Sequence, residues 1–227
     1  MQYAMPFTHT GVLGMCKLND RWSATAGIHR GWDQFSDGHA SLLAGVNWTS
    51  FDERTTAAFA ITAGEEGPDD HMRTMYDLYF TRKIGDRWTY VFEHALGTEA
   101  DGANPGESAN WYSIVNYLFY KLTDHLDLGV RYEWFDDEAG VRVIGIGDPA
   151  SAMPKGFVYP QPPAVAHASA WNELSLGLNY RPNKNFIFRS EVRWDWQTPR
   201  GVGAQPAFND YHDLSQTLWA NDMIFKY

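Results

Sequence analysis

Apolar and polar residues alternate with a period of two through nearly the whole chain, whereas the 3.6-residue period of amphipathic helices is almost absent. In residues 126–135, for example, one row is apolar from Leu126 to Trp134, and the row between contains Asp127, Arg131 and Glu133. The pattern predicts eleven strands, near residues 7–18, 22–33, 40–50, 55–64, 72–84, 87–97, 110–122, 126–137, 170–181, 186–197 and 216–227.

The lengths of these segments and of their connections favour a barrel that spans a membrane. Soluble strands commonly have about 5–6 residues, whereas tilted membrane strands need about 9–11. Short polar turns such as Gly85-Asp86 alternate with long connections, namely residues 34–39, 65–71, 98–109, 138–169 and 198–215. Tight turns on one rim and long loops on the other are typical of bacterial outer-membrane barrels. We therefore predict an all-β, antiparallel up-and-down transmembrane β-barrel with short periplasmic turns and long outer loops.

Aromatic residues indicate which face of the strands meets lipid. A soluble barrel would bury the apolar rows, whereas a membrane barrel turns them outwards and gathers Trp and Tyr at the two interfaces. Aromatic side chains concentrate near the predicted strand ends, which favours the membrane orientation over a soluble ligand-binding barrel. The expected interfacial girdle consists of Trp22, Trp32, Trp48, Trp88, Trp134, Trp194, Trp196, Trp219, Phe225 and Tyr227.

The charged rows would then face the lumen. The expected pore-lining residues are Arg73, Asp77, Lys83, Glu93, Asp127, Arg131, Glu133, Glu173, Arg189, Glu191, Arg193, Asp195 and Asp222. A ladder of opposite charges creates a transverse field that orients dipolar solutes and tunes ion selectivity. Structural ion pairs that fill a narrow lumen are the other interpretation, and the balance depends on the number of strands. Residues 110–122 have aromatic residues in both rows, so their faces cannot be assigned.

Composition and charge restrict the class of protein further. Acidic residues number 28 and basic residues 18, a net charge of −10 that excludes a nucleic-acid partner. Mean hydropathy is −0.43, and no apolar run approaches the roughly 18 residues of a spanning helix. The single cysteine, Cys16, allows neither an intrachain disulfide nor a cysteine-based zinc site.

The parity of the strands predicts a longer protein. Eleven is an odd number, whereas single-chain bacterial barrels have even strand numbers with both termini on the same side. Residues 1–6 also lack the basic and apolar regions of a signal peptide. We expect residues 1–227 to be one domain, the C-terminal portion of a barrel that has twelve or more strands when complete.

Several motifs resemble the outer-membrane porins known as the beta-barrel porin-2, OmpL-like family. The most specific are Gly177-Leu178-Asn179-Tyr180-Arg181-Pro182 and Arg189-Ser190-Glu191-Val192-Arg193-Trp194-Asp195-Trp196. The others are Phe7-Thr8-His9-Thr10-Gly11, Gly31-Trp32-Asp33, Glu133-Trp134-Phe135-Asp136-Asp137, Gly140-Val141-Arg142-Val143 and Asp222-Met223-Ile224-Phe225. The resemblance implies an outer-membrane location and passive transport, and it brings no catalytic or cofactor residues.

The chain lacks recognisable catalytic motifs, so we expect neither an enzyme nor a metal or cofactor site. Its eight histidines form no HExxH motif, and there is no GxSxG or phosphate-binding glycine loop. His94 and Ser113 on successive strands are the one pair that a membrane-embedded hydrolase could use. The Pro- and Gly-rich loop 138–169 either constricts the pore or forms a solvated outer loop or a subunit contact.

We predict an outer-membrane channel for the passive diffusion of small hydrophilic solutes or ions. The alternative is a structural or surface-interaction barrel with a closed lumen. The expected partners are outer-membrane lipid, the diffusing solutes or ions and, in a homo-oligomer, further copies of the chain.

Overall fold

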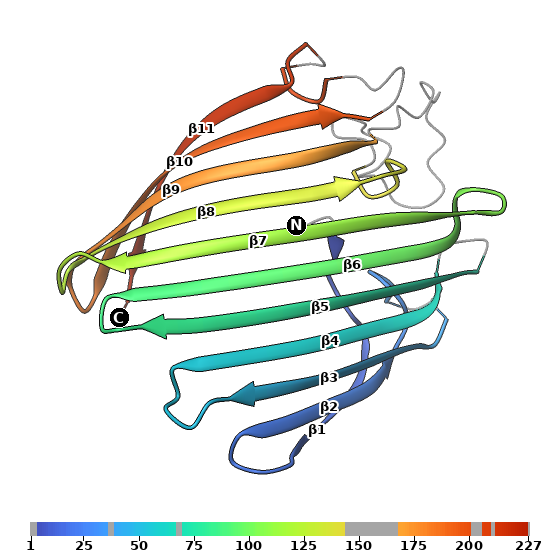
Figure 1. Cartoon of the computed structure of the whole chain (residues 1–227), viewed down its shortest axis with the longest axis horizontal. Helices are drawn as coiled ribbons and strands as arrows, with labels where there is room; N and C mark the ends of the chain where they lie inside the picture. Colours follow the sequence, from blue (N-terminus) through green and yellow to red (C-terminus); the bar gives the residue numbers. More distant parts are fainter. Residues whose placement is uncertain are drawn as a thin grey trace.

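A computed structural model describes residues 4–35, 39–66, 70–143, 168–200, 206–209 and 212–226. They form one antiparallel sheet of eleven strands whose order in the sheet is their order in the chain (Figure 1). No helix in this part of the chain is long and apolar enough to cross a membrane. The strands are β1 (Gly11–Lys17), β2 (Trp22–His29), β3 (Ser41–Thr49), β4 (Thr55–Glu66), β5 (His71–Ile84), β6 (Trp88–Asn104), β7 (Glu107–Lys121), β8 (Leu126–Asp137), β9 (Ser169–Asn183), β10 (Phe186–Pro199) and β11 (Ser215–Phe225).

This topology confirms the predicted up-and-down architecture. Each inner strand bonds to its two sequence neighbours, and among the described strands β1 and β11 each have only one partner. The sheet is strongly curved, and its outermost strands bend behind the central ones (Figure 1). The described strands therefore form an open, barrel-like wall with two free edges.

The tight turns lie at one end of the sheet, at the left of Figure 1, and the long connections lie at the other. In the first tight turn, the side-chain oxygen of Asn19 accepts hydrogen bonds from the backbone N–H groups of Arg21 and Trp22, at 2.9 and 3.0 Å. Gly85 takes a positive φ of 60° in the turn between β5 and β6. Such residues allow a short reversal between strands.

The expected long loop 98–109 is wrong. β6 and β7 continue through this region as one extended hairpin that turns at residues 105–106, where Gly106 has a φ of 84°. Thr98 pairs with Asn110, and Glu99 pairs with Ala109. The polar composition of this segment suggested a loop. Two strands of a hairpin can nevertheless extend past the rest of the sheet, because they satisfy each other's backbone hydrogen bonds.

One face of the sheet is polar and buried. A row across the last five strands joins Val115, Glu133, Glu173, Asp195 and Gln216 in register. The three carboxylate residues of this row are only 5–7% exposed. Paired residues of antiparallel strands lie on the same face, so this row belongs to the inner side of the curved sheet.

The other face is apolar and exposed. The row Leu118, Val130, Leu176, Val192 and Trp219 crosses the same strands in register, and its members are 40–74% exposed. Solvent-exposed aliphatic rows opposite buried carboxylates are the reverse of a soluble barrel and match a wall that faces lipid. This arrangement confirms the orientation predicted from the alternation.

The register also assigns β7, whose two rows could not be distinguished by pattern. Val115 pairs with Glu133, so the row that contains Trp111, Ser113, Tyr117 and Phe119 faces inwards. The row with Tyr112, Ile114, Asn116, Leu118 and Tyr120 faces outwards.

Candidate functional site

All thirteen residues predicted to line a pore lie on the inner face of the sheet. They come from six strands, β5, β6 and β8–β11. Antiparallel pairing keeps them on the same side because residues paired across neighbouring strands project from the same face. The inner surface therefore carries a broad field of ionisable groups, and the structure describes two separate ladders within it.

The upper ladder lies towards the long connections. Arg131 forms salt bridges with both Glu133 and Glu173. Arg193 Nε lies 3.4 Å from a Glu173 oxygen and 2.7 Å from an oxygen of Asp195. Charges thus alternate across β8, β9 and β10, and each carboxylate of this ladder is matched by a guanidinium.

The lower ladder lies towards the tight turns. Arg189 forms two hydrogen bonds with Asp222, at 2.7 and 2.5 Å, and Arg181 forms a salt bridge with Asp127. Arg181 was missing from the predicted pore-lining set. Its position in the polar row of residues 174–181 was a signal that could have found it.

Five of the predicted residues belong to neither ladder, namely Arg73, Asp77, Lys83, Glu93 and Glu191. Among the described residues, Asp77, Lys83 and Glu93 form no salt bridge within 4.0 Å, and Asp77 Oδ1 has no hydrogen-bond partner. Asp77 and Glu93 lie on neighbouring strands, in diagonal positions of the same face. These two carboxylates therefore lie on the inner surface outside the described salt bridges.

A small apolar core fills part of the interior near the long connections. Trp111 is fully buried on β7, and its indole Nε1 donates a hydrogen bond to the carbonyl oxygen of Ala4 at 2.9 Å. Trp32 packs edge-on against Trp111 with ring centroids 6.1 Å apart, and Val143 belongs to the same cluster. Segments from three distant parts of the chain therefore meet inside the sheet.

Trp32 is thus wrongly placed in the predicted girdle. It lies after β2, is 5% exposed, and its backbone N–H donates to both oxygens of Glu66. The guanidinium groups of Arg73 and Arg142 lie 4.9 and 4.8 Å from its ring centroid. The pattern missed this position because a tryptophan beyond a strand end can turn inwards as easily as outwards.

Carboxylates contact both arginines near Trp32, one through its side chain and the other through its backbone. Arg73 forms a two-pronged pair with Glu99, at 3.0 and 2.8 Å. Asp137 accepts hydrogen bonds from three successive backbone N–H groups, those of Val141, Arg142 and Val143. Burial, together with the nearby Arg73, lowers the pKa of Arg142 to about 10, which still leaves its guanidinium protonated at neutral pH.

Asp137 therefore folds the start of the long loop 138–169 inwards. Residues 144–167 of that loop lie outside the described residues.

Eight of the ten predicted girdle residues do lie on the outer face. Trp22, Trp48 and Trp88 are at the tight-turn end, where Trp22 and Trp48 have ring centroids 6.3 Å apart. Phe225 is at the same end, and its ring centroid lies 5.1 Å from that of Phe186. The residues nearer the long connections are Trp134, Trp194, Trp196 and Trp219. Tyr227 lies outside the described residues.

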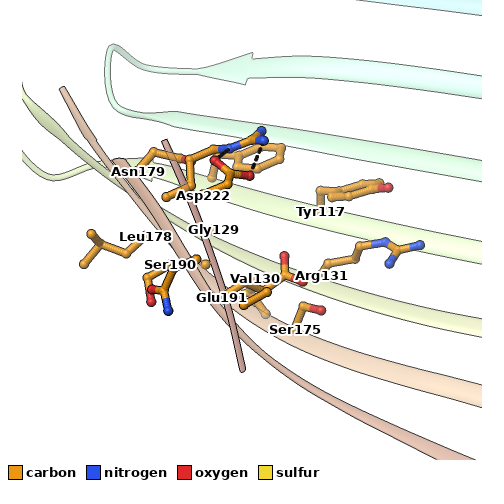
Figure 2. A pocket seen from close by; sticks show the side chains of 15 residues that line it. Tyr117, Gly129, Val130, Arg131, Ser175, Leu178, Asn179, Ser190, Glu191 and Asp222 are labelled. Carbon is orange, nitrogen blue, oxygen red and sulfur yellow. Dashed lines mark hydrogen bonds and ion pairs between the residues drawn. The ribbon is translucent and has the colours of Figure 1, made fainter. Parts of the chain in front are cut away.

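Two cavities follow the inner face. The upper one, of about 490 Å³, lies over the upper ladder and is partly covered by Phe208, which packs edge-on against Trp171 at 6.2 Å. The lower one, of about 420 Å³, lies between β7 and β11 beside the pair Arg189–Asp222 (Figure 2). A charged inner face with hollows along it is the arrangement that a solute pathway needs.

Comparison with known proteins gives the family of the chain. The model of the family described as "Putative beta-barrel porin-2, OmpL-like" matches residues 1–227. The chain belongs to this family. No curated protein sequence matches it.

Solved structures similar to this chain include two proteins. The outer membrane channel DcaP of Acinetobacter baumannii is similar over 94% of this chain and 62% of its own, with a TM-score of 0.63 and 13% identity. A FadL homologue of Pseudomonas aeruginosa is similar over 94% of this chain and 64% of its own, with a TM-score of 0.46 and 13% identity. The likeness to DcaP shows a shared fold. The chain spans less than two thirds of the length of either protein.

The hydrolase pair does not form in this OmpL-like porin. His94 pairs with Ile114 on the outer face, whereas Ser113 pairs with Ala95 on the inner face. The sheet itself therefore separates the two side chains, and they cannot act on one substrate.

Proposed function

We propose that this protein is an outer-membrane channel whose charged inner face passes small hydrophilic solutes or ions by diffusion. The observation that carries the proposal is the sorting of side chains by the sheet: thirteen ionisable residues on one face and exposed aliphatic and aromatic rows on the other. Outer-membrane pores have this arrangement because lipid surrounds the wall and water fills the centre. Membership of the porin family supports the same function.

The charges of the inner face further favour cations over anions. The thirteen residues comprise five basic and eight acidic side chains, and a surplus of two carboxylates remains after Arg181 is added. Rings of carboxylates raise the local concentration of cations and so make a pore cation-selective. We propose that Asp77 and Glu93 contribute to this preference together, because they lie in diagonal positions on neighbouring strands and neither is held in a salt bridge among the described residues.

The two free edges of the sheet bear on how the complete barrel is built. A sheet with two free edges cannot stand in lipid, because unpaired backbone groups are costly there. We propose that further strands outside residues 11–225 close the barrel, so that its number of strands becomes even. The tight turns would then face the periplasm and the long connections the outside.

A closed, structural barrel is the second candidate function, and the interior core favours it. Trp32, Trp111 and Val143 fill part of the space near the long connections, as side chains fill small barrels. Recording currents from the purified protein in planar bilayers separates the two functions. Stable conductance steps support the channel, whereas silence of a correctly folded protein supports the structural barrel.

The same recordings test the charge preference. In a KCl gradient the reversal potential should show that K⁺ passes more readily than Cl⁻. The double variant Asp77→Asn with Glu93→Gln should reduce this preference without breaking a described salt bridge. Glu53→Gln in the turn before β4 makes the same chemical change outside the lumen and should leave the reversal potential unchanged. A channel that prefers Cl⁻, or a preference unaltered by the double variant, would contradict the proposal.

A further inference from the structure

The lower cavity of the inner face contains a notch made by two glycines. Gly129 of β8 and Gly177 of β9 are paired in register, and the same row continues to Phe119 on one side and Glu191 on the other. β7 and β10 are three strand spacings apart, about 14 Å. The two glycines carry no side chain into this space, so the row is hollowed between an aromatic ring and a carboxylate.

The open floor of the notch lies at Gly177. A Cβ atom on Gly129 would lie 3.1 Å from the ring of Phe119, which shows that this ring leans over Gly129. A Cβ atom on Gly177 would meet nothing closer than the carbonyl oxygen of Gly129, at 4.0 Å. The volume of about 420 Å³ is of the size that binds small molecules in proteins.

One wall of the cavity is aromatic. Tyr117 and Phe119 are stacked, with ring centroids 5.8 Å apart and planes 15° apart. The guanidinium of Arg131 already lies 5.5 Å from the Tyr117 centroid, as expected for the attraction between a cation and the face of an aromatic ring. Figure 2 shows Tyr117 and Arg131 together on the side of the cavity towards β7 and β8.

The opposite wall carries a carboxylate that forms no described salt bridge. Glu191 lies in register between Gly177 and Ala220, neither of which can pair with it. Among the described residues it forms no salt bridge within 4.0 Å, whereas Arg189 is bound by Asp222 and Arg131 by two glutamates. The guanidiniums that border the cavity are therefore paired with other carboxylates, whereas Glu191 has only the more distant attraction of Arg189 and Arg193 on its own strand and can accept a cation.

We propose that this cavity is a binding subsite for small organic cations that carry a quaternary or primary ammonium group. Glu191 supplies the counter-charge, the Phe119 and Tyr117 rings supply the aromatic face, and Gly177 supplies the room. An anion would meet guanidiniums that already have partners and a carboxylate that repels it. The proposal deepens the channel function and rests on it, because the subsite would lie along the path of the solute.

Choline and its uncharged isostere 3,3-dimethyl-1-butanol provide the test, since the two differ in charge and hardly in shape. Binding to the purified protein in detergent is measured by isothermal titration calorimetry. Choline should bind, and the isostere should bind at least roughly threefold more weakly. Glu191→Gln should weaken choline binding by roughly two- to fivefold, as expected for an exposed charge pair, and should leave the isostere unaffected.

A second variant tests the shape of the cavity without changing the charge of Glu191. Gly177→Val fills the notch while retaining Glu191, and it should abolish the binding of both compounds. Glu53→Gln, which removes a carboxylate outside the cavity, should bind choline as the unaltered protein does. Equal binding of choline and the isostere, or full choline binding by Glu191→Gln, would overturn the subsite.

Because the binding assay needs no current, it separates this inference from the channel function. Conductance without discrimination between choline and its isostere would refute the subsite alone. Choline binding that depends on Glu191, in a protein that conducts no ions, would retain the subsite and refute the channel. Tighter binding of acetate than of choline would show that the cavity prefers anions and would overturn the proposed cation site.

Discussion

Arg131 should be the residue of the inner face whose loss most weakens the fold. Its guanidinium bridges Glu133 and Glu173, whose side chains are only 9% and 8% exposed. Replacing Arg131 with Met keeps most of the apolar stem but leaves two desolvated carboxylates without that partner. Glu173 retains a hydrogen bond from the Ser175 hydroxyl at 2.8 Å and the more distant Arg193.

The expected loss can be bounded from these contacts. Breaking a buried pair by removing one partner typically costs about 3–5 kcal/mol, because the other charge stays buried. Arg131 is itself 26% exposed and Glu173 keeps Arg193, so we expect about 2–4 kcal/mol for Arg131→Met. With a dependence of about 1–3 kcal/mol per molar urea, the unfolding midpoint should fall by roughly 0.7–4 M.

Urea unfolding in detergent, followed by tryptophan fluorescence, measures this midpoint. Arg54→Met is the matched control, because Arg54 pairs with an Asp86 side chain that is 96% exposed, and such pairs contribute only about 0–1 kcal/mol. Adding Glu173→Gln to Arg131→Met should recover part of the loss by removing one of the stranded charges. Equal midpoints for Arg131→Met and Arg54→Met would refute the reasoning.

Two further predictions use the same unfolding assay. Gly97→Ala should destabilise the protein by about 1–3 kcal/mol, because the new Cβ atom would lie 2.0 Å from the buried Trp111 ring. In the control Gly14→Ala the new Cβ atom has no contact closer than 3.6 Å, so this variant should be nearly neutral. Equal effects would contradict the close packing of Trp111 on Gly97. Leu176→Arg places a charge on the outer face of β9 and should lower the free energy of unfolding in a lipid bilayer by about 2–4 kcal/mol. Asn179→Arg places the same charge on the inner face and should be tolerated. A larger loss for Asn179→Arg than for Leu176→Arg would show that the faces are inverted.

The faces of most strands could be predicted from the sequence because two regularities act together. Side chains alternate along a strand, and antiparallel pairing joins residues of the same face. A polar row such as Arg189, Glu191 and Arg193 therefore stays on one side of the whole sheet. Where both rows are aromatic, as with Tyr117 and Tyr120, alternation carries no information and only the register with β8 decides.

The interior core could not be predicted in this way. It depends on contacts between segments far apart in the chain, such as Trp32 with Trp111 and Trp111 with Ala4. Residues outside the strands follow no period. The sequence therefore cannot distinguish a tryptophan at a lipid interface from one that turns into the barrel near a strand end. The salt bridges of Arg131 with its two glutamates could not be predicted either. The sequence shows that basic and acidic residues alternate, but not which of them pair.

The strand order has a consequence for how the protein reaches its folded state. Every ladder in the sheet joins strands that follow one another in the chain, so each hairpin can form without waiting for a distant segment. The wall can grow one strand at a time, and at each stage only the two outermost edges remain without hydrogen bonds. The contacts of the interior core, such as Trp111 with Ala4, join remote residues, and loop-closure entropy makes them slower to form than the hairpins.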